Sequence, residues 1–325
     1  MHILITGSAG FIGFHLTKLL LAQNHTVVGI DSINNYYSTK LKLDRLFLLN
    51  QHENFEFFTI NICNKEELDE LFRIQHFDMV INLAAQAGVR YSIEKPYKYL
   101  DSNLIGFVNI LEACRNYKVD RLVFASSSSV YGNSSDVPFN VSQMTDQPES
   151  LYAATKKANE LMAYSYSRIY GIKSIGLRFF TVYGPWGRPD MAYFSFANRI
   201  MKGETIQVYN HGNMERDFTY VDDIVTGISQ LVERFDRIPA SYKVYNLGNN
   251  RPVRLLDFIQ TLETYLGKEA QKEMLPMQPG DVLQTYADIS DSQRDFNYQP
   301  HTNIDKGLES FVGWFKSYYP NNADR

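Results

Sequence analysis

Short apolar runs alternate with amphipathic stretches through the first half of this 325-residue chain. The apolar runs predict buried strands at 2–6, 26–30, 55–60, 79–85 and 121–126. Helical periodicity separates them at 11–22, 65–74 and roughly 97–117, and a helix at 151–170 leads to a further strand at 174–180. Strict alternation of strands and helices is typical of βαβ units. The pattern predicts an α/β fold with a Rossmann-like, doubly wound parallel sheet.

Beyond residue 178 the pattern changes to shorter elements. The stretch GPWGRPDM at 184–191 is rich in Gly and Pro and predicts a loop, and short strands and helices follow it. We therefore predict a first domain over 1–178 and a smaller α/β lobe over 179–325. We expect the lobe to be interleaved with the first domain and to lie over the C-terminal edge of its sheet.

Composition narrows the class of protein. Hydrophobic residues make up 44% of the chain and charged residues 21%, as in ordinary globular proteins. A formal net charge of −4 argues against a nucleic-acid partner. No signal peptide precedes the first strand and no apolar run reaches about 20 residues, so we expect a cytoplasmic protein with no membrane partner. Cys63 and Cys114 lack metal-ligand spacing, and we expect reduced core cysteines and no metal site.

The most informative motif follows the first strand. GSAGFIG places Gly7, Gly10 and Gly13 between that strand and the helix at 11–22, the context of a dinucleotide-binding loop. The first glycine makes the turn, the second lets the backbone approach a pyrophosphate, and the third permits close helix–strand packing. The helix N-terminus offers free N–H groups to the phosphates. Asp31 ends the second strand, where its carboxylate can bind the adenosine ribose and repel a 2′-phosphate, which favours NAD over NADP.

Tyr152 and Lys156, within YAATK at 152–156, form a second candidate site. Side chains at i and i+4 share one face of a helix, so the two groups can reach the same point. An ammonium charge beside a phenol favours the phenolate and lowers the phenol pKa, which would make Tyr152 a base. Such a pair also occurs by chance on a solvated helix, so it gains meaning only together with the glycine loop.

The glycine spacing and the Tyr-x-x-x-Lys pair together resemble the extended short-chain dehydrogenase/reductase family. This resemblance implies that Tyr152 and Lys156 are catalytic and lie near a nicotinamide, whose ribose Lys156 holds. Asn61 stands where relatives usually have an aspartate that binds the adenine amine, and its side-chain oxygen can still accept that hydrogen bond. The resemblance implies an NAD site made of Gly7, Gly10, Phe11, Ile12, Gly13, Asp31, Asn34, Asn61, Ile62, Leu83, Ala84, Ala85, Tyr152 and Lys156.

A serine run, FASSSSVYG at 124–132, follows the fifth strand, and ligands bind at the carboxyl ends of parallel strands. The resemblance assigns Ser127 to a hydrogen bond with the reacting sugar hydroxyl, with Ser128 and Ser129 close enough to contribute. The alternative is a polar turn that caps the next segment. Dehydratases and decarboxylases of the family typically carry a glutamate where this chain has Ser129. Dehydration needs that extra proton-transfer group, so its absence favours epimerisation.

Longer stretches resemble the uronic-acid branch of the family, the UDP-glucuronate 4-epimerases, nearly from end to end. The most specific are AAQAGVRYS at 84–92 and RFFTVYGPWGRPDM at 178–191, and NYYSTKLKLDRL at 35–46 matches as well. The resemblance implies that Tyr152 takes the C4 hydroxyl proton of UDP-glucuronate. Oxidation to a 4-keto sugar and re-reduction on its other face would give UDP-galacturonate, with NAD regenerated in each cycle.

A 4-keto sugar with a C6 carboxylate is a β-keto acid that tends to lose CO2, so such an enzyme must hold that carboxylate. We predict that Thr181, Arg188 and the serine run bind it, Arg188 through its fork of N–H donors. The alternative for Arg188 is a surface arginine. By resemblance, Arg216 and Asp281 hold the diphosphate and the uridine ribose, and Arg90 serves either the phosphates or its own loop. The predicted substrate site is Arg90, Ser127, Ser128, Ser129, Tyr152, Thr181, Arg188, Arg216 and Asp281.

Two other functions stay open at this point: epimerisation of a neutral or N-acetylated UDP-sugar, and a non-catalytic NAD-binding regulator. The predicted assembly is a homodimer. The helices at 98–117 and 152–170 have apolar positions beyond what one sheet face can cover. In relatives these two helices pair with their copies, an arrangement suited to two-fold symmetry.

Overall fold

The computed structural model describes residues 1–278 and 281–320. Within them, the central sheet has seven parallel strands in the order β10-β6-β5-β4-β1-β2-β3. These strands are β1 (His2–Thr6), β2 (Thr26–Asp31), β3 (Phe55–Thr59), β4 (Met79–Asn82), β5 (Arg121–Ser127), β6 (Lys173–Phe179) and β10 (Tyr242–Leu247). The strand order reverses between β1 and β4, so the predicted doubly wound α/β fold is confirmed.

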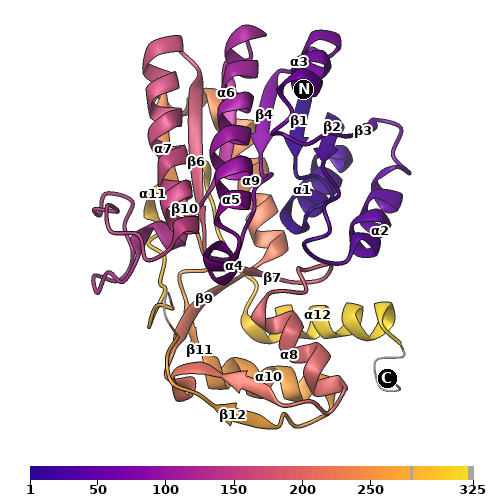
Figure 1. Cartoon of the computed structure of the whole chain (residues 1–325), viewed down its shortest axis with the longest axis vertical. Coiled ribbons are helices and arrows are strands. Elements are labelled where there is room, and N and C mark those ends of the chain that lie inside the picture. Colours follow the sequence, from indigo (N-terminus) through magenta and orange to yellow (C-terminus); the bar gives the residue numbers. More distant parts are fainter. Residues whose placement is uncertain (279–280, 321–325) are drawn as a thin grey trace.

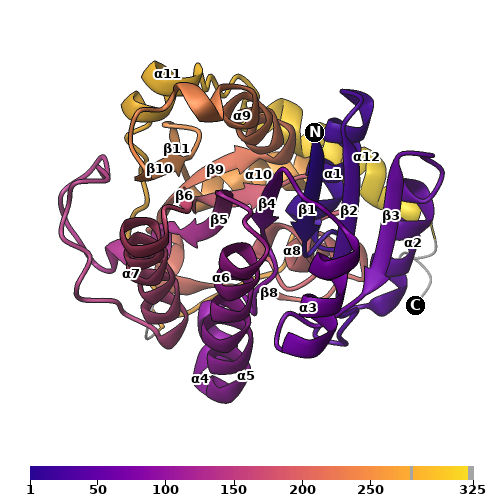
Figure 2. The same ribbon diagram turned by 90° about the horizontal axis from the view of Figure 1, so that it is seen from above.

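Helices cover both faces of the sheet (Figure 2). One face carries α3 (Lys65–Ile74), α6 (Gly106–Asn116) and α7 (Leu151–Tyr170), and the other carries α1 (Phe11–Ala22) and α9 (Val221–Arg234). A hydrophobic core lies on each face of the sheet. Within β1, Leu4 belongs to the core under α3 and α6, whereas Ile3 and Ile5 belong to the core under α1 and α9. Because alternate residues of a strand face opposite sides and both sides are buried, the sequence contains unbroken apolar runs rather than an alternating pattern.

A smaller lobe lies beyond the carboxyl ends of the main sheet (Figure 1). Its elements are β7 (Thr181–Tyr183), α8 (Ala192–Met201), β8 (Ile206–Val208), β9 (Glu215–Tyr220), β11 (Pro252–Arg254), α10 (Leu255–Leu266), β12 (Lys272–Met274) and α12 (Ile304–Tyr318). The strands form a three-stranded sheet, β11-β9-β7, and a two-stranded sheet, β12-β8. A separate aromatic-rich core, which includes Phe194, Phe218 and Phe311, stabilises the lobe.

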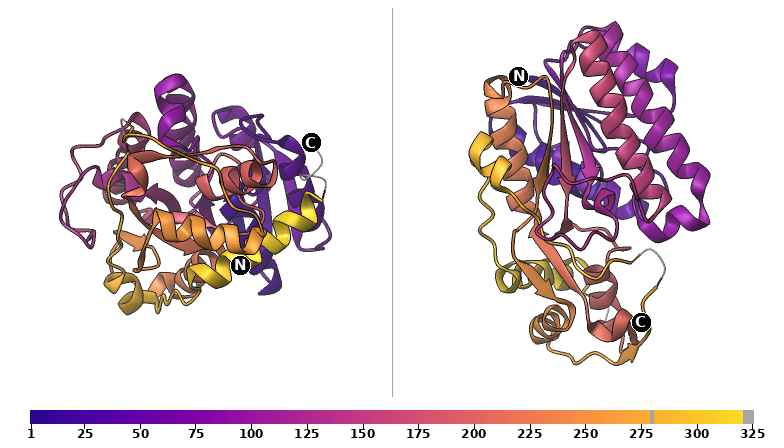
Figure 3. Two further views of the ribbon diagram at one scale, coloured as in Figure 1. Left: turned by 90° about the horizontal axis from the view of Figure 1, so that it is seen from below. Right: turned by 90° about the vertical axis from the view of Figure 1, so that its left-hand side faces the viewer.

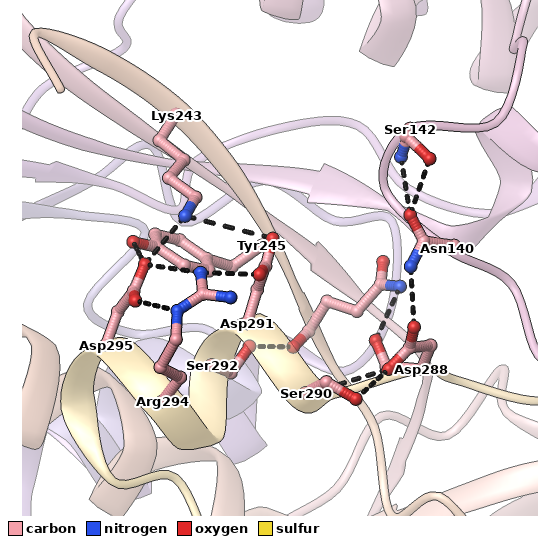
Figure 4. A network of polar contacts seen from close by, with 11 residues as sticks. Asn140, Ser142, Lys243, Tyr245, Asp288, Ser290, Asp291, Ser292, Arg294 and Asp295 are labelled. Atoms are coloured by element: carbon pink, nitrogen blue, oxygen red, sulfur yellow. Dashed lines mark hydrogen bonds and ion pairs between the residues drawn. The ribbon is translucent and has the colours of Figure 1, made fainter.

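Two elements from the second half of the chain return to the main sheet. Strand β10 pairs with β6, and α9 packs on α1. Helix α11 (Ser290–Phe296) is held against β10 by a polar network, in which Lys243 and Tyr245 both donate to Asp295, at 2.7 and 2.6 Å (Figure 4). The division into domains 1–178 and 179–325 stays a prediction.

The helix predicted at 97–117 consists of three joined pieces: α5 (Pro96–Tyr99), a π-helical segment (Leu100–Ile105) and α6. The π-helical segment carries Asn103, whose side-chain oxygen accepts the Gln86 N–H at 2.8 Å. Its amide nitrogen donates to Thr155 Oγ1 of α7 at 3.0 Å. Asn103 therefore links the loop after β4 to the helix that carries Tyr152.

The remaining helices are short or lie at the edges. They are α2 (Thr39–Leu49), α4 (Val89–Glu94) and the 3₁₀ turns Ser128–Tyr131, Tyr209–Gly212 and Phe235–Arg237. We did not predict α2 from the sequence. Among the described residues, no helix combines the length and the apolar character needed to cross a bilayer.

Candidate active site

A cavity of about 440 Å³ lies at the carboxyl ends of β1, β2, β4 and β5, next to the start of the lobe. In doubly wound sheets ligands bind at this edge, where the strand order reverses. Every residue of the predicted cofactor site lines this cavity. Ser127, Ser128, Ser129, Thr181 and Arg188 of the predicted substrate site line it too. The fold thus brings the glycine loop, the serine run and the Tyr-x-x-x-Lys pair to one place.

The glycine loop forms a wall of this cavity where side chains cannot be accommodated. A Cβ on Gly13 would lie 2.1 Å from the carbonyl oxygen of Gly7, and a Cβ on Gly10 would lie 2.8 Å from the same atom. Helix α1 begins at Phe11 with no side-chain cap and no acidic residue in its first turn. Its N–H groups and positive end can therefore bind an anion, and the loop fits the pyrophosphate of a dinucleotide.

Asp31, at the end of β2, lies in the cavity wall and accepts the Ile33 N–H at 2.9 Å. Burial raises the pKa of Asp31, and the charges of Lys42 and Arg45 oppose that rise. Lys42 lines the same cavity and donates to the Asn34 carbonyl oxygen at 2.8 Å. The carboxylate fits a ribose diol, while the nearby ammonium partly offsets the repulsion expected toward a 2′-phosphate.

Tyr152 and Lys156 lie in the first two turns of α7, which begins at Leu151 with Ser150 as its N-cap. Burial raises the pKa of Tyr152, and a hydrogen bond with Ser127 and the charge of Arg188 oppose that rise. Burial lowers the pKa of Lys156 to about 8, and its Nζ donates to the Ala125 carbonyl oxygen at 2.9 Å. In the protein chain alone, Ser127 and Arg188 favour the phenolate of Tyr152, and the expectation that Lys156 also lowers the pKa of Tyr152 stays a prediction.

Arg188 lies in the loop between β7 and α8, and 21% of its side chain is exposed. Since it lines the large cavity, the alternative of a surface arginine is wrong. Burial by itself would lower the pKa of Arg188, but the charge of Asp190 and a hydrogen bond to it raise the pKa. The cavity therefore contains a permanently charged guanidinium near Tyr152 and the serine run.

A smaller cavity of about 170 Å³ continues from the large one. Ser128, Ser129 and Thr181 line both cavities, whereas Arg216 and Asp281 line only the smaller one. Arg216 donates to the Leu283 carbonyl oxygen at 3.1 Å. Because Ser128, Ser129 and Thr181 line both cavities, the two cavities adjoin at the serine run.

Arg90 lines neither cavity. Its guanidinium binds Asp281 at 3.2 Å, lies 4.5 Å from the centre of the Tyr209 ring, and is about half exposed. Of the two roles proposed from the sequence, this geometry favours support of Arg90's own loop, which the ion pair links to Asp281. Asp281 itself directly follows the residues outside the described part of the chain.

Sequence reasoning missed several residues of the large cavity. Tyr36, Tyr37 and Lys42 come from the segment between β2 and the middle of α2, and Gln86 and Met191 come from two loops. The available signal was the similarity of the stretches 35–46, 84–92 and 178–191 to one branch of a family. That signal marked the segments but not which side chains face the cavity.

Residues 3–248 match the family model described as the NAD dependent epimerase/dehydratase family. The chain belongs to this family. Its glycine loop, serine run and Tyr-x-x-x-Lys pair all lie within the matched residues. The confirmed fold and this membership agree with the resemblance found in the sequence.

Three relatives of this epimerase/dehydratase chain are informative. Protein CapI from Staphylococcus aureus is 54% identical over 98% of this chain and 99% of its own length. UDP-glucuronate 4-epimerase 4 from Arabidopsis thaliana is 47% identical over 98% of this chain and 76% of its own. The crystal structure of UDP-glucuronic acid 4-epimerase from Bacillus cereus, in complex with UDP-glucuronic acid and NAD, has a TM-score of 0.92 and 35% identity. It covers 98% of this chain and 100% of that chain.

Proposed function

We propose that this protein is an NAD-dependent UDP-glucuronate 4-epimerase, which interconverts UDP-glucuronate and UDP-galacturonate through a 4-keto intermediate. The observation that carries the proposal is the guanidinium of Arg188, only 21% of whose side chain is exposed, in the same cavity as Tyr152 and Ser127. A fixed positive charge beside the catalytic pair suits a sugar with a carboxylate better than a neutral sugar. The similarity to two UDP-glucuronate 4-epimerases supports the same substrate.

The residues that would hold NAD are those of the glycine loop, Asp31, Asn61 and Lys156. Asn61 lines the cavity, and its side-chain oxygen already accepts the Cys63 N–H at 3.0 Å. Since an amide oxygen has two lone pairs, it can accept a second hydrogen bond from an adenine amine. When bound, NAD+ would supply a reversible acceptor for the hydride of sugar C4.

The proton chemistry belongs to Tyr152. As a phenolate it takes the proton of the C4 hydroxyl when the ketone forms, and it returns that proton to the alkoxide when the ketone is reduced. The hydroxyl of Ser127, which lines the same cavity as Tyr152, can hold the C4 oxygen in both directions. A Lys156 charge held close to the site favours the phenolate. Epimerisation follows when the 4-keto sugar turns over before it is reduced.

The remaining polar groups of the site would prevent a side reaction, the loss of CO2 from the 4-keto sugar. Thr181, Ser128 and Ser129 line both cavities and offer hydroxyl donors, and Arg188 offers a charged donor. A carboxylate held by these groups in the plane that disfavours CO2 loss stays on the sugar. Arg216 and Asp281 in the smaller cavity would bind the diphosphate and the uridine ribose.

The proposal includes a homodimer formed by α7 and the helical path from α4 to α6. On this surface, Leu161, Ile169 and Ile105 are 59%, 66% and 56% exposed. Leu161 and Ile169 are eight residues apart in α7 and so share one face of that helix. The right panel of Figure 3 shows α6 and α7 side by side on the outside of the sheet. Such exposed apolar groups support an interface between two copies. The cytoplasmic location expected from the sequence stays a prediction.

The test is to incubate the purified protein with UDP-glucuronate and to resolve the product sugars by NMR. We expect UDP-galacturonate to appear until the two uronates reach equilibrium, without net consumption of NAD. Parallel reactions with UDP-glucose and UDP-N-acetylglucosamine serve as substrate controls. Conversion of a neutral sugar without conversion of UDP-glucuronate would assign the alternative epimerase activity, and no conversion of any sugar would favour a regulator.

A further inference from the structure

The Arg188 guanidinium forms an ion pair with the carboxylate of Asp190 on its own loop. Its Nε donates to Asp190 Oδ1 at 3.1 Å, and its Nη2 donates to Asp190 Oδ2. Within residues 1–278 and 281–320, its Nη1 has no protein acceptor. Arg188 lines the large cavity whereas Asp190 does not, so the carboxylate lies behind the guanidinium as seen from the cavity.

Asp190 is in turn held from a distant part of the chain. The Tyr36 hydroxyl donates to Asp190 Oδ2 at 3.1 Å, and the Tyr36 ring lies 4.7 Å from that of Tyr91. A Cβ on Gly88 would lie 3.0 Å from the Tyr36 hydroxyl, so this loop closely encloses the hydroxyl. The acidic partner of Arg188 is therefore fixed on two sides.

A second contact holds the same two segments together. Arg45 is fully buried and donates to the carbonyl oxygens of Trp186 and Gly187, at 2.6 and 3.1 Å. It also donates to the Tyr37 hydroxyl at 2.8 Å and to the Ala9 carbonyl oxygen of the glycine loop at 2.7 Å. The stretch 35–46, which the sequence marked without a role, is thus a support for the loop that carries Arg188.

We propose that Asp190, held by Tyr36, is a positioning residue that orients Arg188 toward the sugar carboxylate. This inference rests on the proposed function. Asp190 binds one N–H of Nε and one of Nη2, which leaves both N–H groups of Nη1 for the substrate. Because the ion pair is only 21% and 26% exposed, the guanidinium has little freedom while Asp190 is present. Asp190 and Tyr36 thereby determine the preference for charged over neutral sugars and the retention of CO2.

The experiment compares Asp190→Ala, Asp190→Asn and Tyr36→Phe with Arg188→Ala. For each variant, the KM of UDP-glucuronate and the Ki of UDP-glucose as a competitive inhibitor are measured, together with the fraction of turnovers that release a UDP-pentose. Bound NAD and the melting temperature are recorded to check folding. Asp291→Ala removes a carboxylate partner of the surface Arg294 and serves as the matched control.

We expect Asp190→Ala to raise the KM of UDP-glucuronate about tenfold and to leave the Ki of UDP-glucose within about twofold, with increased pentose release. Asp190→Asn, whose amide oxygen can still accept one hydrogen bond, should keep part of the preference for UDP-glucuronate over UDP-glucose that Asp190→Ala loses. Tyr36→Phe should act in the same direction but more weakly, and Asp291→Ala should change neither constant.

Two outcomes would overturn the inference. Suppose that Asp190→Ala weakens the binding of UDP-glucuronate and UDP-glucose equally, while Arg188→Ala weakens only the binding of UDP-glucuronate. Arg188 then binds the carboxylate without help from Asp190. If Arg188→Ala weakens both ligands equally, then the carboxylate role of Arg188 fails and the inference fails with it. Should Asp190→Ala not fold, Asp190→Asn and Tyr36→Phe decide the question by the same comparison of the KM of UDP-glucuronate with the Ki of UDP-glucose.

Discussion

Glu160 of α7 and Arg178 of β6 form a buried, two-pronged ion pair directly behind the serine run. Nε and Nη2 of Arg178 each donate to the Glu160 carboxylate at 2.8 Å, and both side chains are almost completely buried. The same carboxylate accepts the Ser126 hydroxyl at 2.7 Å. This pair therefore fixes the catalytic helix to two strands, one residue away from Ser127.

We expect Glu160→Gln to lower the free energy of unfolding by about 3–5 kcal/mol, because it leaves the Arg178 charge buried without its carboxylate counter-charge. Urea denaturation measures this value. Replacing both residues, as Glu160→Leu with Arg178→Met, should cost less than Glu160→Gln alone. An equal or larger loss in the double variant would mean that the pair itself contributes the stability.

Tyr152→Phe should keep the fold and bound NAD, since the ring packs on Tyr99 at 6.0 Å and the substitution removes only the hydroxyl. Without the proton acceptor, the epimerisation rate should fall at least ~10²-fold. The initial rate by NMR and the cofactor absorbance provide the measurements, and the exposed Tyr164→Phe in the same helix is the control. Near-normal turnover would refute the role of Tyr152.

His15 of α1 should make stability depend on pH. Burial lowers the pKa of His15 to about 4 from an ordinary value of 6.5, and its Nε2 lies 2.9 Å from the Pro185 carbonyl oxygen. Between these two values the unfolded chain binds a proton that the folded protein does not, so stability falls as the pH drops below about 6.5.

Lowering the pH from 7 to 5 should therefore cost the wild type about 2 kcal/mol through His15. His15→Gln should lose that part of the pH dependence, because an amide does not titrate in this range. Urea denaturation at both pH values tests this, with the exposed His76→Gln as the control. An unchanged difference between the two pH values in His15→Gln would contradict the assignment.

The exposed apolar surface of α7 should bury itself between two copies. Light scattering at micromolar concentration should give twice the chain mass for the wild type. Leu161→Asp should shift the mass toward that of a monomer, because a carboxylate would be buried in an apolar interface. Leu43→Asp on α2 is a matched control, since Leu43 is 54% exposed on another surface. A monomeric wild type would exclude the homodimer at that concentration.

The sequence alone determined six strands of the main sheet and the local chemistry of the site. Buried parallel strands give unbroken apolar runs, and the glycine loop and the Tyr152–Lys156 pair depend on spacing within a single turn or helix. The order of elements then places the carboxyl ends of the strands at one edge. For these features, neighbours in space are close in the chain or follow from the alternation of elements.

Only the tertiary structure decided which distant side chains meet. Nothing in the sequence around Arg188 indicates that Asp190 would bind its Nε and Nη2. Nor does it indicate that Tyr36, 154 residues before Asp190, would donate a hydrogen bond to Asp190. The same is true of β10 as the seventh strand and of Arg45 as a support for the loop at 186–187. Hydrogen bonds and ion pairs between distant segments depend on the path of the backbone and on burial. A one-dimensional pattern of hydrophobic and polar positions contains neither.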